Sequence, residues 1–110
     1  MSDERKRLTE MLRSHYHSSG WKVEADDGRL EATGPHGVKW IGRAVVPEDL
    51  QSEEFEAEII DLADRRMPGG GELRPLDLLP APECREGLDG LLERTGLARH
   101  THVSVYSIAA

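Results

Sequence analysis

The chain has 110 residues, the usual length of one globular domain, so we expect a single domain over residues 1–110. It carries 21 acidic and 14 basic side chains, which give a net charge of −7. This charge disfavours binding to nucleic acids and to anionic membrane surfaces, and it favours a basic protein partner. Cys84 is the only cysteine, which excludes an intramolecular disulfide and a zinc site built from cysteines of one chain.

The sequence also limits where the protein works. No apolar run approaches the roughly 18 residues that a membrane-spanning helix needs. The first eight residues, MSDERKRL, are mostly charged and lack the apolar centre of a secretory signal. We therefore expect a cytoplasmic protein without a membrane partner.

The first half of the chain predicts one helix and three strands. Residues 3–19 form a helix, because Leu8, Leu12 and His15 recur at the spacing of one helical face. Apolar residues then alternate with charged ones over residues 21–33 on both sides of the turn signal DDG, which predicts a hairpin. The segment 38–46 is apolar on both faces, so it is expected to form a central strand.

The second half predicts two more pairs of a helix and a strand. A helix is expected from Ser52 to about Met67, followed by a strand over residues 72–79 that Pro75 should confine to a sheet edge. A third helix begins in the segment PAPE and ends at Gly96. The alternating segment 102–108 is the last strand.

These elements have the order αβββαβαβ. We therefore predict an α/β (α+β) fold with a mixed sheet of about five strands, in which a three-strand antiparallel meander is followed by strands reached through crossovers. Helices should pack on the sheet and bury the apolar faces of the strands.

This element order is similar to the core of restriction-endonuclease-like nucleases over about residues 3–80. The resemblance implies an acidic residue on the second strand and an acidic-x-Lys motif on the third, which together bind a divalent cation. Glu31 matches the first position, but the third strand, Trp40–Ala44, has no acidic-x-Lys motif. The resemblance therefore implies the fold without nuclease activity, because a hard cation would have too few oxygen ligands.

Four of the five histidines form two His-x-His pairs, at positions 15 and 17 and at positions 100 and 102. Imidazoles are common ligands of zinc and other divalent metals, which makes such a metal the one candidate cofactor. His15, His100 and His102 would supply three ligands if the first helix lay against the last strand. The alternative is that both pairs are polar residues at the ends of elements, where imidazoles interact with terminal carbonyls.

The second predicted helix carries a dense run of carboxylates. Such a run is either the solvated face of the helix or a surface that binds a basic partner. Its members are Glu53, Glu54, Glu56, Glu58, Asp61 and Asp64.

No set of nucleophile, base and oxyanion donors can be assembled from the sequence, so we predict no catalytic residues. The leading hypothesis is a small acidic, non-enzymatic module that acts through protein–protein contacts. It would bind a basic partner or form a homodimer through an exposed edge strand, either 72–79 or 102–108. One alternative is a metal-binding protein or hydrolase built on the three histidines. Another is a catalytically inactive nuclease-like fold with a structural or nucleic-acid-related role.

Overall fold

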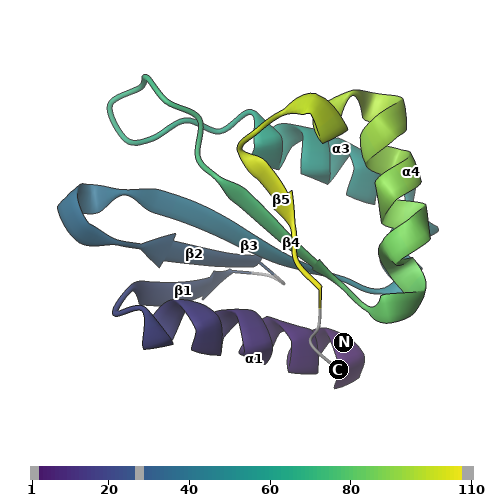
Figure 1. Ribbon diagram of the computed structural model, residues 1–110, viewed down its shortest axis with the longest axis horizontal. Helices are drawn as coiled ribbons and strands as arrows, with labels where there is room; N and C mark the ends of the chain where they lie inside the picture. Colours follow the sequence, from purple (N-terminus) through teal and green to yellow (C-terminus); the bar gives the residue numbers. More distant parts are fainter. Residues whose placement is uncertain (1–2, 27–28, 108–110) are drawn as a thin grey trace.

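The computed structural model describes residues 3–26 and 29–107 (Figure 1). Its α-helices are α1 (Asp3–Ser18), α2 (Pro47–Leu50), α3 (Glu53–Ala63) and α4 (Arg85–Thr95). Three short 3-10 helices are η1 (Pro35–Gly37), η2 (Pro82–Cys84) and η3 (Leu97–Arg99). The strands are β1 (Lys22–Asp26), β2 (Arg29–Thr33), β3 (Lys39–Val45), β4 (Leu76–Pro80) and β5 (Val103–Val105).

The strands form one mixed sheet in the order β1-β2-β3-β4-β5. The first three strands pair antiparallel, and β4 and β5 extend the sheet in parallel. This arrangement confirms the predicted α/β fold, its element order and the central place of β3. The reason lies in the sequence of β3, since a strand that is apolar on both faces is stable only where both faces are covered.

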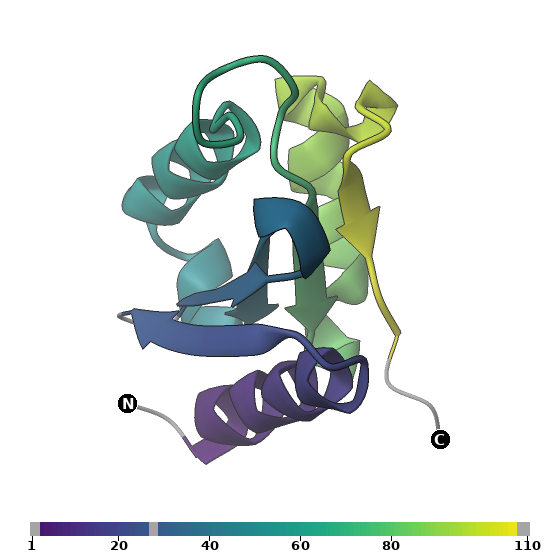
Figure 2. The same ribbon diagram turned by 90° about the vertical axis from the view of Figure 1, so that its left-hand side faces the viewer.

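The helices cover the two faces of this sheet. Figures 1 and 2 show α1 on one face and α3 and α4 on the other. From α1, Leu8 and Leu12 are almost fully buried, and Ile59 of α3 and Leu88 of α4 fill the opposite layer. Each such side chain contributes about 1.5–3 kcal/mol through removal of apolar surface from water. None of the helices in residues 3–26 and 29–107 has the length and apolar character to span a membrane.

The prediction of an edge strand over residues 72–79 is wrong. β4 lies between β3 and β5, and all five of its residues are buried. Pro75 directly precedes β4, where its missing N–H removes no hydrogen bond from the ladder, and its carbonyl accepts a hydrogen bond from Ile41 N–H at 2.9 Å. The two edges of the sheet are therefore β1 and β5.

Several predicted boundaries differ from the structure. α3 ends at Ala63 instead of Met67, and the unpredicted turn of helix α2 begins at Pro47, a residue favoured at the first position of a helix. β5 has only three residues, and Ile108 lies outside the described part of the chain, as do the last two residues of the DDG turn. The predicted stop of the third helix is confirmed, because Gly96 adopts the left-handed conformation at φ 83°.

Candidate functional site

The structure brings two of the three candidate metal ligands together. The rings of His100 and His102 lie 5.4 Å apart, and Nε2 of His102 is 2.7 Å from the carbonyl oxygen of Ala63. His15 instead packs against Tyr106, with ring centroids 5.7 Å apart. His102 precedes β5 and Tyr106 follows it, so the two histidine pairs lie at opposite ends of that strand.

This placement separates His15 from the other two histidines. Among the described residues, no three His, Cys, Asp or Glu side chains lie close enough together to hold a metal ion. His102 is held at its place by the end of α3, which matches the expectation of an imidazole near terminal carbonyls.

The acidic run on α3 divides into inward and outward carboxylates. Glu58 points toward the sheet, where it accepts hydrogen bonds from Arg43 at 3.0 and 3.1 Å. Glu56 binds Arg94 of α4 at 2.6 Å. These two side chains hold α3 to its neighbours. The exposed members of the run are Glu53, Glu54, Asp61 and Asp64.

Two of these exposed carboxylates lie beside an apolar groove of about 440 Å³, which we call the α3 groove. Ile60 lies in it with 46% of its surface exposed, the largest exposed fraction among the large apolar side chains described. Exposed Asp61 and Asp64 flank this apolar surface, and Asp61 also pairs with Arg65 at 3.1 Å. The groove is lined by Ala57, Ile60, Asp61, Ala63, Asp64, Leu73, Leu97 and His100.

The α3 groove unites residues that sequence reasoning considered separately. Asp61 and Asp64 come from the acidic run, and His100 comes from the second histidine pair. Ile60 and Leu73 were not predicted as site residues. The signal for Ile60 was present, because it lies outside the helical series of Phe55, Ile59 and Leu62 that marks the buried face of α3.

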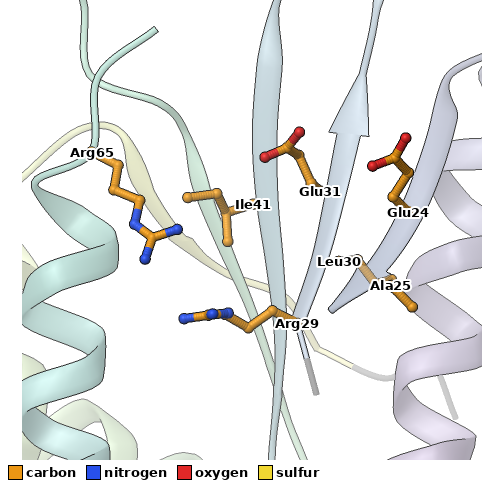
Figure 3. A pocket seen from close by; sticks show the side chains of 7 residues that line it. All are labelled: Glu24, Ala25, Arg29, Leu30, Glu31, Ile41 and Arg65. Atoms are coloured by element: carbon orange, nitrogen blue, oxygen red, sulfur yellow. The ribbon is translucent and has the colours of Figure 1, made fainter. Parts of the chain in front are cut away.

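A second pocket of about 340 Å³ lies over β1, β2 and β3 (Figure 3). It contains Glu31, the residue that matches the acidic position of the nuclease resemblance. Figure 3 shows the carboxylates of Glu31 and Glu24 on one side and the guanidinium groups of Arg29 and Arg65 on the other. Ile41, directly opposite Glu31 on β3, stands between them.

Glu31 is already engaged by basic side chains. Its two oxygens lie 3.2 Å from Nζ of Lys39 and 3.0 Å from Nη1 of Arg74. Partial burial raises the pKa of Glu31, but these two cations outweigh that effect and lower the pKa below its ordinary value. A divalent cation would have to displace both basic groups to reach this carboxylate.

Cys84 has the surroundings of an unreactive thiol. It is buried, and its burial together with Glu83 and Glu4 raises the pKa of the thiol to about 11. A thiolate is the reactive form of cysteine, and this environment disfavours it.

No protein-family model matches the chain, and no curated protein and no solved structure is significantly similar to it. The likeness to the restriction-endonuclease-like core therefore remains one of element order. The α3 groove is the candidate functional site on its own geometry, because it combines exposed apolar surface with charged side chains on its rim.

Proposed function

We propose that the protein is a non-enzymatic interaction module that binds a basic segment of a partner protein in the α3 groove. The observation that supports this proposal is the exposed side chain of Ile60 between apolar walls and two carboxylates. Exposed apolar surface with a polar rim is typical of protein-binding sites on soluble domains. A cytoplasmic location belongs to the proposal, because the only cysteine is buried and the fold requires no disulfide.

The groove and its rim have different roles in this proposal. Ile60, Leu73 and Leu97 supply apolar surface, which provides affinity when a partner side chain covers it. Asp61 and Asp64 select a lysine or arginine next to that side chain and fix its orientation.

The net charge favours a basic partner over a second copy of the chain. A charge of −7 attracts a basic protein over several ångströms and raises the rate of association. Two identical copies would instead repel one another through the same field. We therefore infer a heterologous complex, with lysine or arginine beside an apolar anchor in the bound segment.

The test is a titration of the full chain with a synthetic peptide that has leucine on one face and arginine on the other. Fluorescence anisotropy measures the binding. We expect saturable binding that weakens with added salt. Ile60→Glu should abolish binding, because it places a charge where the apolar anchor sits. The same substitution should leave thermal stability nearly unchanged, since Ile60 is exposed.

A matched pair of double variants tests the rim. Asp61→Asn with Asp64→Asn should weaken peptide binding about tenfold or more, because both carboxylates lie in the groove. Glu53→Gln with Glu54→Gln removes the same charge from the same helix but outside the groove, and it should have a much smaller effect. If both double variants lost the same affinity for the peptide, binding would depend on net charge alone. That result would contradict binding in the α3 groove. If the chain self-associated and Ile60→Glu abolished that self-association, the α3 groove would bind a second copy of the chain and not a basic partner.

A further inference from the structure

The two edges of the sheet differ in how they are protected against pairing with a further strand. β1 carries the exposed charged side chains of Lys22 and Glu24, which disfavour such pairing. The residues of β5, Val103–Val105, are uncharged, and no acidic residue follows Glu93 in the sequence. Figure 2 shows β5 in yellow at the outer edge of the sheet. β5 is therefore the edge without charged side chains to keep another strand away.

Alternate residues of β5 direct their backbone groups away from β4. The N–H of Leu76 donates to the carbonyl of His102, and the N–H of Tyr106 donates to the carbonyl of Leu78, each at 2.8 Å. In a parallel ladder with this register, residues 102, 104 and 106 face β4. Residues 103, 105 and 107 therefore present their backbone groups on the outer side.

Four of these outer backbone groups have no partner. The N–H of Val103 is already engaged, since it donates to the carbonyl of His100 at 3.2 Å. Among the described residues, none binds the carbonyls of Val103 and Val105 or the N–H groups of Val105 and Ser107.

This set of four groups is complementary to itself. In an antiparallel pair with a two-fold axis at Val105, each Val105 exchanges two hydrogen bonds with Val105 of the second copy. Each N–H of Ser107 then donates to the carbonyl of Val103 in the other copy, so the pair uses the four groups and no others. A two-fold axis at Ser104 would instead require the N–H of Val103, which is engaged within its own chain.

We infer that β5 pairs with β5 of a second copy in this register, so that the two sheets join into one. The contact is separate from the α3 groove, because no residue from 103 to 107 lines that groove. Two chains of net charge −7 repel one another, which weakens the dimer at low salt. The absence of acidic residues after Glu93 keeps like charges of the sequence out of the paired segments themselves.

A groove of about 400 Å³ beside β5 provides apolar surface for the same contact. Ser104 lies beside Asp77, which contacts α1, so Ser104 and Tyr106 are on the face of the sheet that α1 covers. In the inferred register, Tyr106 lies opposite Ser104 of the second copy, at this groove. Stable interfaces usually bury about 1,200–2,000 Å² in total, so a short strand pair needs such adjoining surface. The groove is lined by Met11, Leu12, His15, Leu79, Tyr106 and Ser107.

Sedimentation velocity of the full chain over a range of concentrations tests for the dimer. We expect a monomer–dimer equilibrium that shifts toward the dimer as salt is added, whereas binding of the basic peptide weakens with salt. Ile60→Glu should leave this equilibrium unchanged, so failure of this inference and failure of the α3 groove are distinguishable. A chain that stays monomeric up to about 1 mM would overturn the inference, as would a dimer that Ile60→Glu abolishes.

Two substitutions of Val105 test the strand pairing. Val105→Pro removes an N–H from the outer side of β5 without removing a hydrogen bond to β4, and it should raise the dissociation constant of the dimer at least about tenfold. Val105→Thr is the matched control, because it keeps both the N–H and a branched side chain, and it should dimerise as the original chain does. Equal dimerisation of the two variants would contradict pairing through β5.

Cysteine cross-linking tests the register and does not depend on the folding of the proline variant. Val105→Cys should form an intermolecular disulfide with oxidised glutathione, because opposite residues of a hydrogen-bonded pair have Cα atoms about 5.5 Å apart. Ser107→Cys is the control, since the two residues 107 would lie more than about 13 Å apart. Cys84 should not interfere, because it is buried and the pKa of its thiol is raised to about 11. Cross-linking of Ser107→Cys as fast as that of Val105→Cys would contradict the inferred pairing.

Discussion

At the scale of single residues, Gly42 of β3 allows the contact between Tyr16 and the buried carboxylate of Asp77. A Cβ atom at this position would lie 2.9 Å from the Tyr16 hydroxyl oxygen. That hydroxyl donates to Asp77, so the missing side chain of Gly42 leaves room for this hydrogen bond to the buried carboxylate. Glycine in a strand interior is often found where another group approaches closely.

Gly42→Ala is therefore expected to lower the free energy of unfolding by about 1–3 kcal/mol, the usual cost of overpacking a core. The Tyr16 ring must shift, and its hydrogen bond to Asp77 lengthens or breaks. Urea denaturation monitored by circular dichroism measures the difference.

Gly90 of α4 provides the control for this substitution. Nothing lies within 4 Å of a Cβ built on Gly90, and its position is inside a helix. Gly90→Ala should therefore raise the free energy of unfolding by up to about 1 kcal/mol. If Gly42→Ala is as stable as the original chain, the Tyr16 hydroxyl does not need the space that the structure assigns to it.

The sequence indicates some of these residues but not their partners. The apolar run LDLL contains Asp77, and an acidic residue in a buried strand is a signal that can be recognised. Its donor, Tyr16, lies 61 residues away in the chain, so only the packing of α1 on the sheet identifies it. The histidines are the converse case. Their spacing is visible in the sequence, but their separation depends on which end of β5 each pair meets.

At the scale of elements, Asp49 connects four segments at one end of the sheet. It accepts hydrogen bonds from both Nη atoms of Arg5 on α1 at 2.9 and 3.0 Å. Arg43 of β3 lies 3.3 Å away and also binds Glu58 of α3. The N–H of Val46, just before α2, donates to Asp49 at 2.9 Å, as an acidic side chain in the first turn of a helix does. This network explains why α2 forms although it has only one turn.

Asp49→Asn should lower the free energy of unfolding by about 3 kcal/mol, because it leaves the buried guanidinium of Arg43 without part of its counter-charge. Asp89→Asn is the matched control, since Asp89 is an exposed member of an i,i+4 pair with Arg85 and should change stability by less than about 0.5 kcal/mol. Thermal and urea unfolding of both variants measure the two effects. Similar losses for Asp49→Asn and Asp89→Asn would contradict a structural role for this network.

Alternation and helical periodicity were sufficient to predict most of the elements. β1 and β2 have clear period-two patterns, β3 is a largely apolar run, and short turns join them, which made the meander predictable. The place of β4 in the sheet was not predictable from Pro75 alone. A proline within a strand indicates an edge strand, whereas a proline just before a strand is compatible with a central one. The network around Asp49 was also hidden, since its members come from α1, β3, α2 and α3.

At the scale of the whole molecule, the buried carboxylates of Asp49 and Asp77 contribute to the free energy of unfolding with opposite dependences on pH. Burial raises the pKa of Asp49, but the hydrogen bonds from Arg5 and Val46 and the charge of Arg43 outweigh it and lower the pKa below its ordinary value. Its contribution to stability is therefore present near neutral pH and is lost as the pH falls through its folded pKa. Burial also raises the pKa of Asp77, and there Tyr16, Tyr106 and His15 offset it only in part.

The raised pKa of Asp77 means that the folded chain holds this proton more tightly than the unfolded chain, in which an aspartate titrates near about pH 3.9. The stability that Asp77 contributes is complete below that pH and is lost as the pH rises through its folded pKa. Asp77→Asn cannot ionise but still offers an oxygen to Tyr16. We therefore expect the melting temperature of the variant, relative to the original chain, to rise from acid to neutral pH. Thermal unfolding of both proteins across this range measures the difference, and the contribution of Asp49 cancels because both proteins contain it. A difference that stays flat or falls with pH would mean that the folded protein holds Asp77 as a well-solvated or fully paired carboxylate.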